Sequence, residues 1–293
     1  MTYDFIQVFT SDDIKLSGLV SHGSTDKTAY IFIHGFETDF YSYDFYHAIS
    51  QKLSAQGNLC ILAQHRGTGL HTEFIKKDGS DAYIGSLHEK IEEAHLDISA
   101  FIEYLVNEGF QKIGLIGHSL GTIKVVRYLF EGKYKDKIES LILLAPFDKN
   151  AWIQRKSQDK WKDYLKVAEQ KIAEGKGEEV VPLPDYEDYP VTYNTFLSWY
   201  NQSDISCMWD FYRKDYDFPI LRQINVPVKV ILGSKDEFMD FPEFGVSQQS
   251  ALDKIKELIK NSETVLLEGS DHVYRGFEDQ LATEVASFEI KPS

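Results

Sequence analysis

The chain has 293 residues, of which 43% are hydrophobic, so it is long enough for one large domain or two modest ones. Its formal net charge is −15, and so acidic a surface repels phosphate backbones and anionic lipid, which argues against nucleic-acid binding. No run approaches the roughly 18 apolar residues of a membrane span, and the N-terminus shows no secretory signal. With only Cys60 and Cys207 present, no disulfide framework is expected, and this pattern is typical of a cytoplasmic protein.

The first half of the chain alternates between segments typical of strands and segments typical of helices. The expected strands are Tyr3–Phe9, Ile14–Val20, Ala29–Ile33, Leu59–Ala63, Lys112–Ile116 and Ile138–Leu144. The expected helices are Tyr43–Leu53, the long region Ile84–Asn107, and Thr122–Phe130. This alternation predicts an α/β fold with a mostly parallel sheet covered by helices.

The alternation stops at Asp148 and resumes after about Phe218. The intervening stretch contains no clear buried strand, an irregular acidic part at 174–189, and all four tryptophans: Trp152, Trp161, Trp199 and Trp209. We therefore expect a largely helical cap at 148–218, inserted after the sixth strand, and a core domain made of 1–147 and 219–293. The core then continues with strands Val226–Leu232 and Glu263–Leu267 and helices Ser247–Ile259 and Gly276–Phe288.

The pentapeptide Gly117-His118-Ser119-Leu120-Gly121 has the G-x-S-x-G pattern of a nucleophile elbow. An apolar strand precedes it and a long segment without Pro or Gly follows it, which is the strand–turn–helix order that an elbow requires. A serine hydroxyl is a poor nucleophile unless a base takes its proton, so the motif predicts a histidine and a carboxylate elsewhere. The alternative is a glycine-bounded turn with a surface serine.

The partners of an elbow serine follow it in the chain, the carboxylate first and the histidine second. His272 is the only histidine after Ser119 and comes directly after an expected strand, so it is the candidate base. Asp236 follows the strand Val226–Leu232 and is the preferred carboxylate, with Glu237 and Asp240 as rivals. Asp271 is a weak candidate, because the side chains of adjacent residues point apart.

An oxyanion hole needs two backbone N–H groups directed at the position where negative charge develops. One is expected from Leu120, the residue after the nucleophile, and the second from Phe36, in the loop that begins His34-Gly35-Phe36 after the third strand. We interpret His34 as a buried structural histidine that shapes this loop. His118 is expected to have a supporting role in the elbow.

Five segments in order carry a resemblance to a known superfamily: His34-Gly35, His65-Arg66-Gly67-Thr68-Gly69, the elbow, Gly233-Ser234-Lys235-Asp236 and Asp271-His272. From about Ile14 to Phe288 the chain resembles the α/β-hydrolase superfamily, and most of all its serine esterases, lipases and acyl hydrolases with a cap. The resemblance implies an eight-stranded, mostly parallel sheet, no metal and no cofactor. The loop after His34 lacks a His-Gly-Gly-Gly run, so the branch of esterases defined by that run is a poorer match.

These observations predict a serine hydrolase that cleaves a carboxylic ester or thioester through an acyl-enzyme on Ser119. The aromatic insertion favours a small-molecule substrate with apolar or aromatic bulk. Two alternatives stay open: an acyltransferase or amide hydrolase on the same three residues, and a non-catalytic ligand receptor. The sequence leaves the natural substrate and the oligomeric state open, a homodimer included.

Other ligand sites have little support in the sequence. There is no Walker A pattern and no G-x-G-x-x-G, so no nucleotide cofactor is expected. His88, Glu92 and His95 are spaced to share one helical face and could ligate a metal, but their order is not that of H-E-x-x-H. A solvated acidic helix explains these three residues better.

Overall fold

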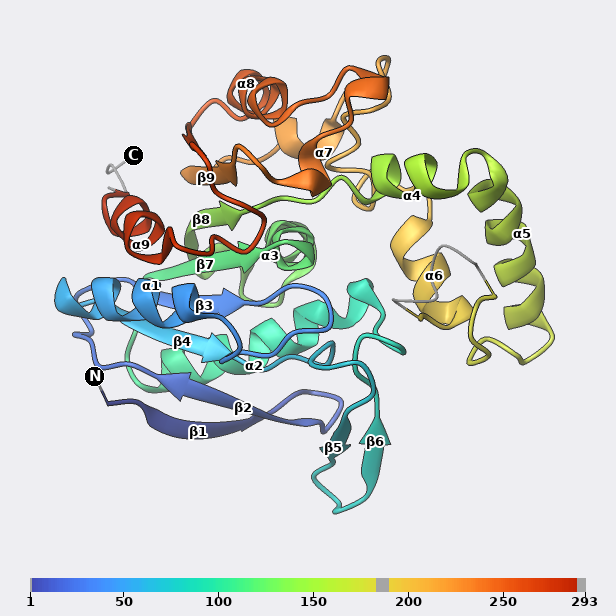
Figure 1. Ribbon diagram of the computed structural model, residues 1–293. Coiled ribbons are helices and arrows are strands. Elements are labelled where there is room, and N and C mark those ends of the chain that lie inside the picture. Colours follow the sequence, from blue (N-terminus) through green and yellow to red (C-terminus); the bar gives the residue numbers. More distant parts are fainter. Residues whose placement is uncertain (1, 183–189, 289–293) are drawn as a thin grey trace.

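The computed structural model describes residues 2–182 and 190–288. Within these residues eight strands form one sheet in the order β1-β2-β4-β3-β7-β8-β9-β10 (Figure 1). Its strands are β1 (Asp4–Phe9), β2 (Lys15–Val20), β3 (Ala29–Ile33), β4 (Leu59–Ala63), β7 (Ile113–His118), β8 (Ile138–Leu144), β9 (Val228–Gly233) and β10 (Ser262–Leu267). The pairs β1–β2 and β2–β4 are antiparallel and all others are parallel, which confirms the expected mostly parallel sheet.

Helices cover both faces of this sheet. Helices α1 (Asp44–Ala55) and α9 (Glu278–Ala286) pack together on one face, and α2 (Ala94–Asn107), α3 (Leu120–Glu131) and α8 (Gln248–Leu258) cover the other. Strand β3 shows why both faces are apolar. Tyr30 and Phe32 enter the core on the α1 side, whereas Ile31 and Ile33 enter the core on the α3 side. All five residues of β3 are buried, which is the pattern of a central parallel strand.

The described part of the segment between β8 and β9 combines helices with turns and irregular stretches, such as residues 201–218. It contains α4 (Lys149–Ser157), α5 (Lys160–Ala173) and α6 (Tyr193–Tyr200), followed by the short α7 (Pro219–Arg222). In Figure 1 the helices α4, α5 and α6 lie beyond the carboxyl ends of the parallel strands. Of the irregular stretch expected at 174–189, residues 183–189 lie outside the described residues.

Two features differ from the sequence prediction. The helical region expected from Ile84 begins only at Ile91, with the single 3₁₀ turn η1 (Ile91–Glu93) leading into α2. The amides of Gly85, Ser86 and Leu87 donate to carbonyls of residues 66, 69 and 70 instead of forming helical bonds. The second feature is a small hairpin of β5 (Glu73–Ile75) and β6 (Asp81–Tyr83), which was not predicted from the sequence.

The remaining described elements are short 3₁₀ turns: η2 (Lys135–Lys137), η4 (Glu237–Met239) and η5 (Pro242–Phe244). None of the helices in residues 2–182 and 190–288 is both long enough and apolar enough to cross a membrane.

Candidate active site

Ser119 lies in a sharp turn between β7 and α3. Its backbone φ is 53° and its ψ is −122°. This conformation is strained for a residue with a Cβ, and such strain recurs at functional sites. The flanking glycines permit this turn because a Cβ on Gly117 would lie 2.6 Å from the Gly121 carbonyl oxygen. A Cβ on Gly121 would lie 2.3 Å from the carbonyl oxygen of Ile33. The turn therefore needs glycine on both sides for steric reasons.

The side chains of Ser119, His272 and Asp236 form a hydrogen-bonded chain. Nε2 of His272 lies 2.9 Å from Oγ of Ser119, and its Nδ1 lies 2.9 Å from both carboxylate oxygens of Asp236. Asp236 is fully buried, and one of its oxygens also accepts from the amide of Phe238 at 3.0 Å. These contacts bring the three residues expected from the sequence together from the ends of three different strands.

The rival carboxylates have other surroundings. Glu237 lies beside the cavity described below, and its side chain has no hydrogen bond or ion pair among the described residues. The backbone carbonyl of Asp240 accepts a hydrogen bond from the Arg155 side chain. Asp271 accepts from the amides of Val273 and Arg275 and so orders the turn that carries His272. Among these acidic residues, only Asp236 contacts the ring of His272.

The loop after β3 passes directly over Ser119. A Cβ on Gly35 would lie 2.9 Å from Cβ of Ser119, so only glycine allows this close approach. Leu120 is the first residue of α3, and its amide therefore has no acceptor within the helix. Phe36 follows Gly35 and lines the same cavity as Leu120 and Ser119. The two residues expected to supply the oxyanion donors therefore line the same cavity as Ser119.

Two buried histidines support these loops. Nε2 of His118 lies 3.0 Å from the carbonyl oxygen of His272 and donates to it, which holds the turn of the candidate base. Burial and the neighbouring His272 lower the pKa of His118 to about 3, so its ring is neutral. His34 is fully buried, with Nδ1 at 2.9 Å from the Gly35 carbonyl and Nε2 at 2.9 Å from Oγ1 of Thr68. Burial lowers the pKa of His34 well below its ordinary value.

Comparison with known proteins places the chain in a family. A family model described as a protein of unknown function (DUF1749) matches residues 69–288. The chain belongs to the DUF1749 family. No curated protein matches it.

Several solved structures resemble the DUF1749 chain over nearly its whole length. The α/β hydrolase GrgF from Penicillium sp. sh18 is 16% identical, with 97% of this chain and 96% of that chain covered and a TM-score of 0.66. Est1E from Butyrivibrio proteoclasticus with ferulic acid bound is 16% identical, with 96% of each chain covered and a TM-score of 0.63. Mouse alpha/beta hydrolase domain-containing protein 10 is 19% identical, with 97% of each covered and a TM-score of 0.59. At these identities the likeness concerns the fold, and the DUF1749 chain has the α/β-hydrolase fold.

An aromatic cavity of about 430 Å³ adjoins Ser119 in this DUF1749 protein. Its walls come from the core and from the helical segment after β8, and its aromatic residues are Phe36, Tyr43, Phe147, Trp152, Trp199, Tyr200 and Phe238. The rings of Phe36 and Trp199 meet edge to face with centroids 4.8 Å apart, and Phe238 packs on His272 at 4.5 Å. A larger hollow of about 740 Å³ lies at the opposite ends of the strands, away from Ser119.

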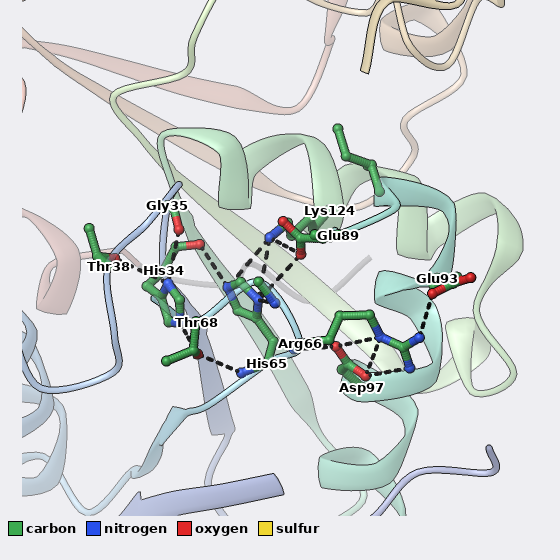
Figure 2. A network of polar contacts seen from close by, with 12 residues as sticks. His34, Gly35, Thr38, His65, Arg66, Thr68, Glu89, Glu93, Asp97 and Lys124 are labelled. Atoms are coloured by element: carbon green, nitrogen blue, oxygen red, sulfur yellow. Dashed lines mark hydrogen bonds and ion pairs between the residues drawn. The ribbon is translucent and has the colours of Figure 1, made fainter. Parts of the chain in front are cut away.

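A buried polar network lies behind the loop that carries Phe36 (Figure 2). It joins His34 and His65, whose rings stack at 3.8 Å, to Lys124 and Glu89. A neighbouring branch links buried Arg66 to a group of carboxylates: Asp12, Glu93 and Asp97. In the sequence His65 stood out only as part of a motif, and neither Lys124 nor Glu89 was predicted. The available signal was a lysine placed between apolar residues in the helix after the elbow.

The alternative metal site is not assembled. His88 pairs with Glu178 across the loop that precedes η1, and Glu92 accepts from Ser198. Within residues 2–182 and 190–288 no group of three or more His, Cys, Asp or Glu side chains is arranged to hold a metal ion.

Proposed function

We propose that this protein is a serine hydrolase that cleaves a carboxylic ester or thioester through an acyl-enzyme on Ser119. The observation that carries the proposal is the continuous hydrogen-bonded chain from Ser119 through His272 to Asp236 at one end of an aromatic cavity. This constellation of a nucleophile, a base and a buried orienting carboxylate is recognised by its geometry. The esterases among the structural neighbours are consistent with it.

In the proposed reaction, Nε2 of His272 takes the proton of Ser119 as its Oγ attacks the carbonyl carbon. Asp236 holds Nδ1–H of His272 and stabilises the imidazolium that forms. The amides of Phe36 and Leu120 donate to the oxyanion of the tetrahedral intermediate. His272 then protonates the leaving alcohol or thiol, and a water activated by the same ring releases the acid.

We further propose that residues 148–218 act as a cap that shapes the substrate pocket. Support comes from Trp152, Trp199 and Tyr200, which this segment contributes to the cavity next to Ser119. Walls of this kind suit an acyl or alcohol group with apolar or aromatic bulk. Because one neighbour, Est1E, has ferulic acid bound, aromatic esters belong in the substrate panel beside aliphatic ones.

The test compares wild-type protein with Ser119→Ala on p-nitrophenyl esters of increasing acyl size. Loss of the nucleophile should lower kcat by a factor of about 10⁴–10⁶, because a triad serine has no substitute. A fluorophosphonate probe should label the wild type and fail to label Ser119→Ala. Ser11→Ala, which removes an exposed serine, is the matched control and should behave as wild type.

Three outcomes separate the alternatives. Full ester hydrolysis by Ser119→Ala would disprove the proposal. A folded wild type that neither hydrolyses esters nor reacts with the probe would favour the non-catalytic receptor. Rapid release of p-nitrophenol only when an alcohol or amine is added would favour the acyltransferase.

A further inference from the structure

Histidine side chains hold the two carbonyl groups that precede Phe36 (Figure 2). The carbonyl oxygen of His34 lies 3.2 Å from Nε2 of His65, and that of Gly35 lies 2.9 Å from Nδ1 of His34. Because a carbonyl oxygen only accepts, each of these ring nitrogens carries a proton. The Gly35 carbonyl shares one planar trans peptide group with the amide of Phe36, so the two point in opposite directions. Holding that oxygen therefore fixes the direction of the Phe36 N–H.

The contacts of His65 specify one tautomer. Its Nδ1 lies 3.1 Å from the amide nitrogen of Gly67, which can only donate, so Nδ1 is the acceptor and Nε2 carries the proton. Oε1 of Glu89 also lies 3.5 Å from Nδ1, and two acceptors at this separation repel each other. The ammonium of Lys124 removes the conflict by offsetting the charge of Glu89, because it lies 2.5 Å from Oε1 of that carboxylate. It lies 3.4 Å from Nδ1 and 3.5 Å from Nε2 of His65, so it acts through Glu89 and not by bonding one ring nitrogen.

Stability alone gives little reason for this arrangement. Lys124 and Glu89 are each 1% exposed, and the desolvation cost of a buried ion pair commonly cancels its attraction. Burial raises the pKa of Glu89, but the ammonium of Lys124 outweighs it and lowers that pKa to about 2. Oε2 of Glu89 has no hydrogen-bond partner among the described residues, so the pair is also incompletely satisfied.

We propose that Lys124, held in place by Glu89, is a positioning residue that keeps His65 in its Nε2–H tautomer. His65 then fixes the carbonyl of His34, and the ring of His34 donates to the Gly35 carbonyl and so orients the Gly35–Phe36 peptide. The inference rests on the proposed acyl-enzyme chemistry at Ser119. Lys124 lies on α3, which begins directly after Ser119. One helix thus presents the nucleophile at its start and controls the opposing donor loop through its buried lysine.

Removing the ammonium alone should disturb the histidine. In Lys124→Met the carboxylate of Glu89 faces Nδ1 of His65 unopposed and favours a proton there. That Nδ1–H confronts the amide of Gly67 and moves the ring away from the His34 carbonyl. In Lys124→Met/Glu89→Gln, by contrast, the glutamine amide can donate to Nδ1 without any buried charge, which restores the original tautomer.

The experiment combines ¹⁵N NMR of the histidine rings with ester kinetics. Wild type should show neutral His65 protonated at Nε2 near pH 7, and Lys124→Met should show protonation at Nδ1. In Lys124→Met kcat should fall by about 10- to 100-fold with KM within about twofold, because an oxyanion donor acts mainly in the transition state. The double variant should recover kcat to within about threefold of wild type. Lys133→Met, which removes an exposed ion pair with Glu103, is the control and should leave kcat unchanged.

Several results would overturn the inference. One is a wild-type His65 that carries its proton on Nδ1. Another is a folded Lys124→Met with wild-type kcat. A third is a double variant with the Nε2–H tautomer but without recovery of kcat.

If Lys124→Met does not fold, the inference is still tested by the tautomer of His65 in the wild type and by the tautomer and kcat of the double variant. Failure of the proposed function is distinguishable, because it would appear as ester hydrolysis that does not depend on Ser119.

Discussion

Gly121 shows how one missing side chain holds the nucleophile in place. Its position allows the first turn of α3 to lie against the end of β3, where the Ile33 carbonyl would be 2.3 Å from a Cβ. Real Cβ atoms do not approach a backbone oxygen so closely, and a backbone oxygen in a central strand cannot move aside easily. A side chain at Gly121 must therefore push α3, and Ser119 with it, away from β3.

We predict that Gly121→Ala lowers kcat for ester hydrolysis by at least tenfold. It should also lower the free energy of unfolding by about 1–3 kcal/mol, the usual cost of overpacking a core. Steady-state kinetics and urea unfolding measure the two effects separately. The matched control is Gly79→Ala, where φ is 85° but no atom lies within 4 Å of the added Cβ. That control should lose stability through backbone strain and keep kcat, and equal kcat losses in both variants would contradict the steric explanation.

At the scale of elements, the sequence predicted best those segments whose pattern is decided locally. Ala29–Ile33, Leu59–Ala63 and Ile138–Leu144 are confirmed with the same boundaries. The first two are continuous apolar runs buried on both faces, and the third becomes one from Leu141 onward. Residues 84–90 were wrongly expected to be helical, since the amides of residues 85–87 bond to the loop at 66–70. The β5–β6 hairpin has three residues in each strand, too few to show an alternation.

In the candidate site, too, the residues with a local sequence signal were predicted and those joined only by long-range contacts were not. Ser119, Asp236 and His272 follow from a local motif and a fixed order along the chain, and the structure brings them together. Lys124 and Glu89 could not be paired from the sequence, because their contact depends on how α3 packs on the loop before η1. Long-range contacts between buried charges have no periodic signature.

We expect helix α6 to contribute to substrate binding through Trp199. Trp199 of α6 lines the cavity and packs edge to face on Phe36. Trp199→Leu should raise KM for esters with a bulky apolar acyl group by about tenfold, since the lost contact area is worth roughly 1–2 kcal/mol. Its effect on acetyl esters should be small, and kcat should stay within a few-fold of wild type.

The control is Trp209→Leu, which changes a buried tryptophan of the same inserted segment that does not line this cavity. It should lower stability and leave the KM ratio between bulky and acetyl esters unchanged. An equal change of that ratio in both variants would show that the segment acts only through its stability.

For the whole molecule, charge determines how stability depends on pH. The net charge is −15, and two of the acidic side chains are buried. Asp148 at the start of the inserted segment and Asp210 near its end are each 1% exposed. Asp148 accepts from the amides of Ala151 and Phe211, whereas Oδ1 of Asp210 has no partner among the described residues. Burial raises the pKa of both carboxyls, and the charge of Asp210 raises that of Asp148 further.

The direction of the pH effect follows from proton binding. A carboxyl whose pKa is raised by folding binds more protons in the folded state over the pH range between its unfolded pKa, about 4, and its folded pKa. Stability therefore falls as pH rises from about 4 toward neutral, and it recovers as pH falls. Lys149 acts in another window, because burial lowers its pKa to about 8 and its effect lies above that pH.

We predict that Tm rises as pH is lowered from 7.5 to 5.5, by about 2–4 °C for each kcal/mol gained in a chain of this size. Relief of repulsion as the protein nears its pI of about 5.0 adds to this slope. Asp210→Asn should flatten the slope, because Asp148 then loses the neighbouring charge that raises its pKa. Asp215→Asn removes an exposed carboxylate from the same segment, makes the same change in net charge and should keep the wild-type slope. Thermal unfolding followed by circular dichroism measures all three proteins, and parallel slopes for the two variants would assign the pH effect to net charge and not to the buried pair.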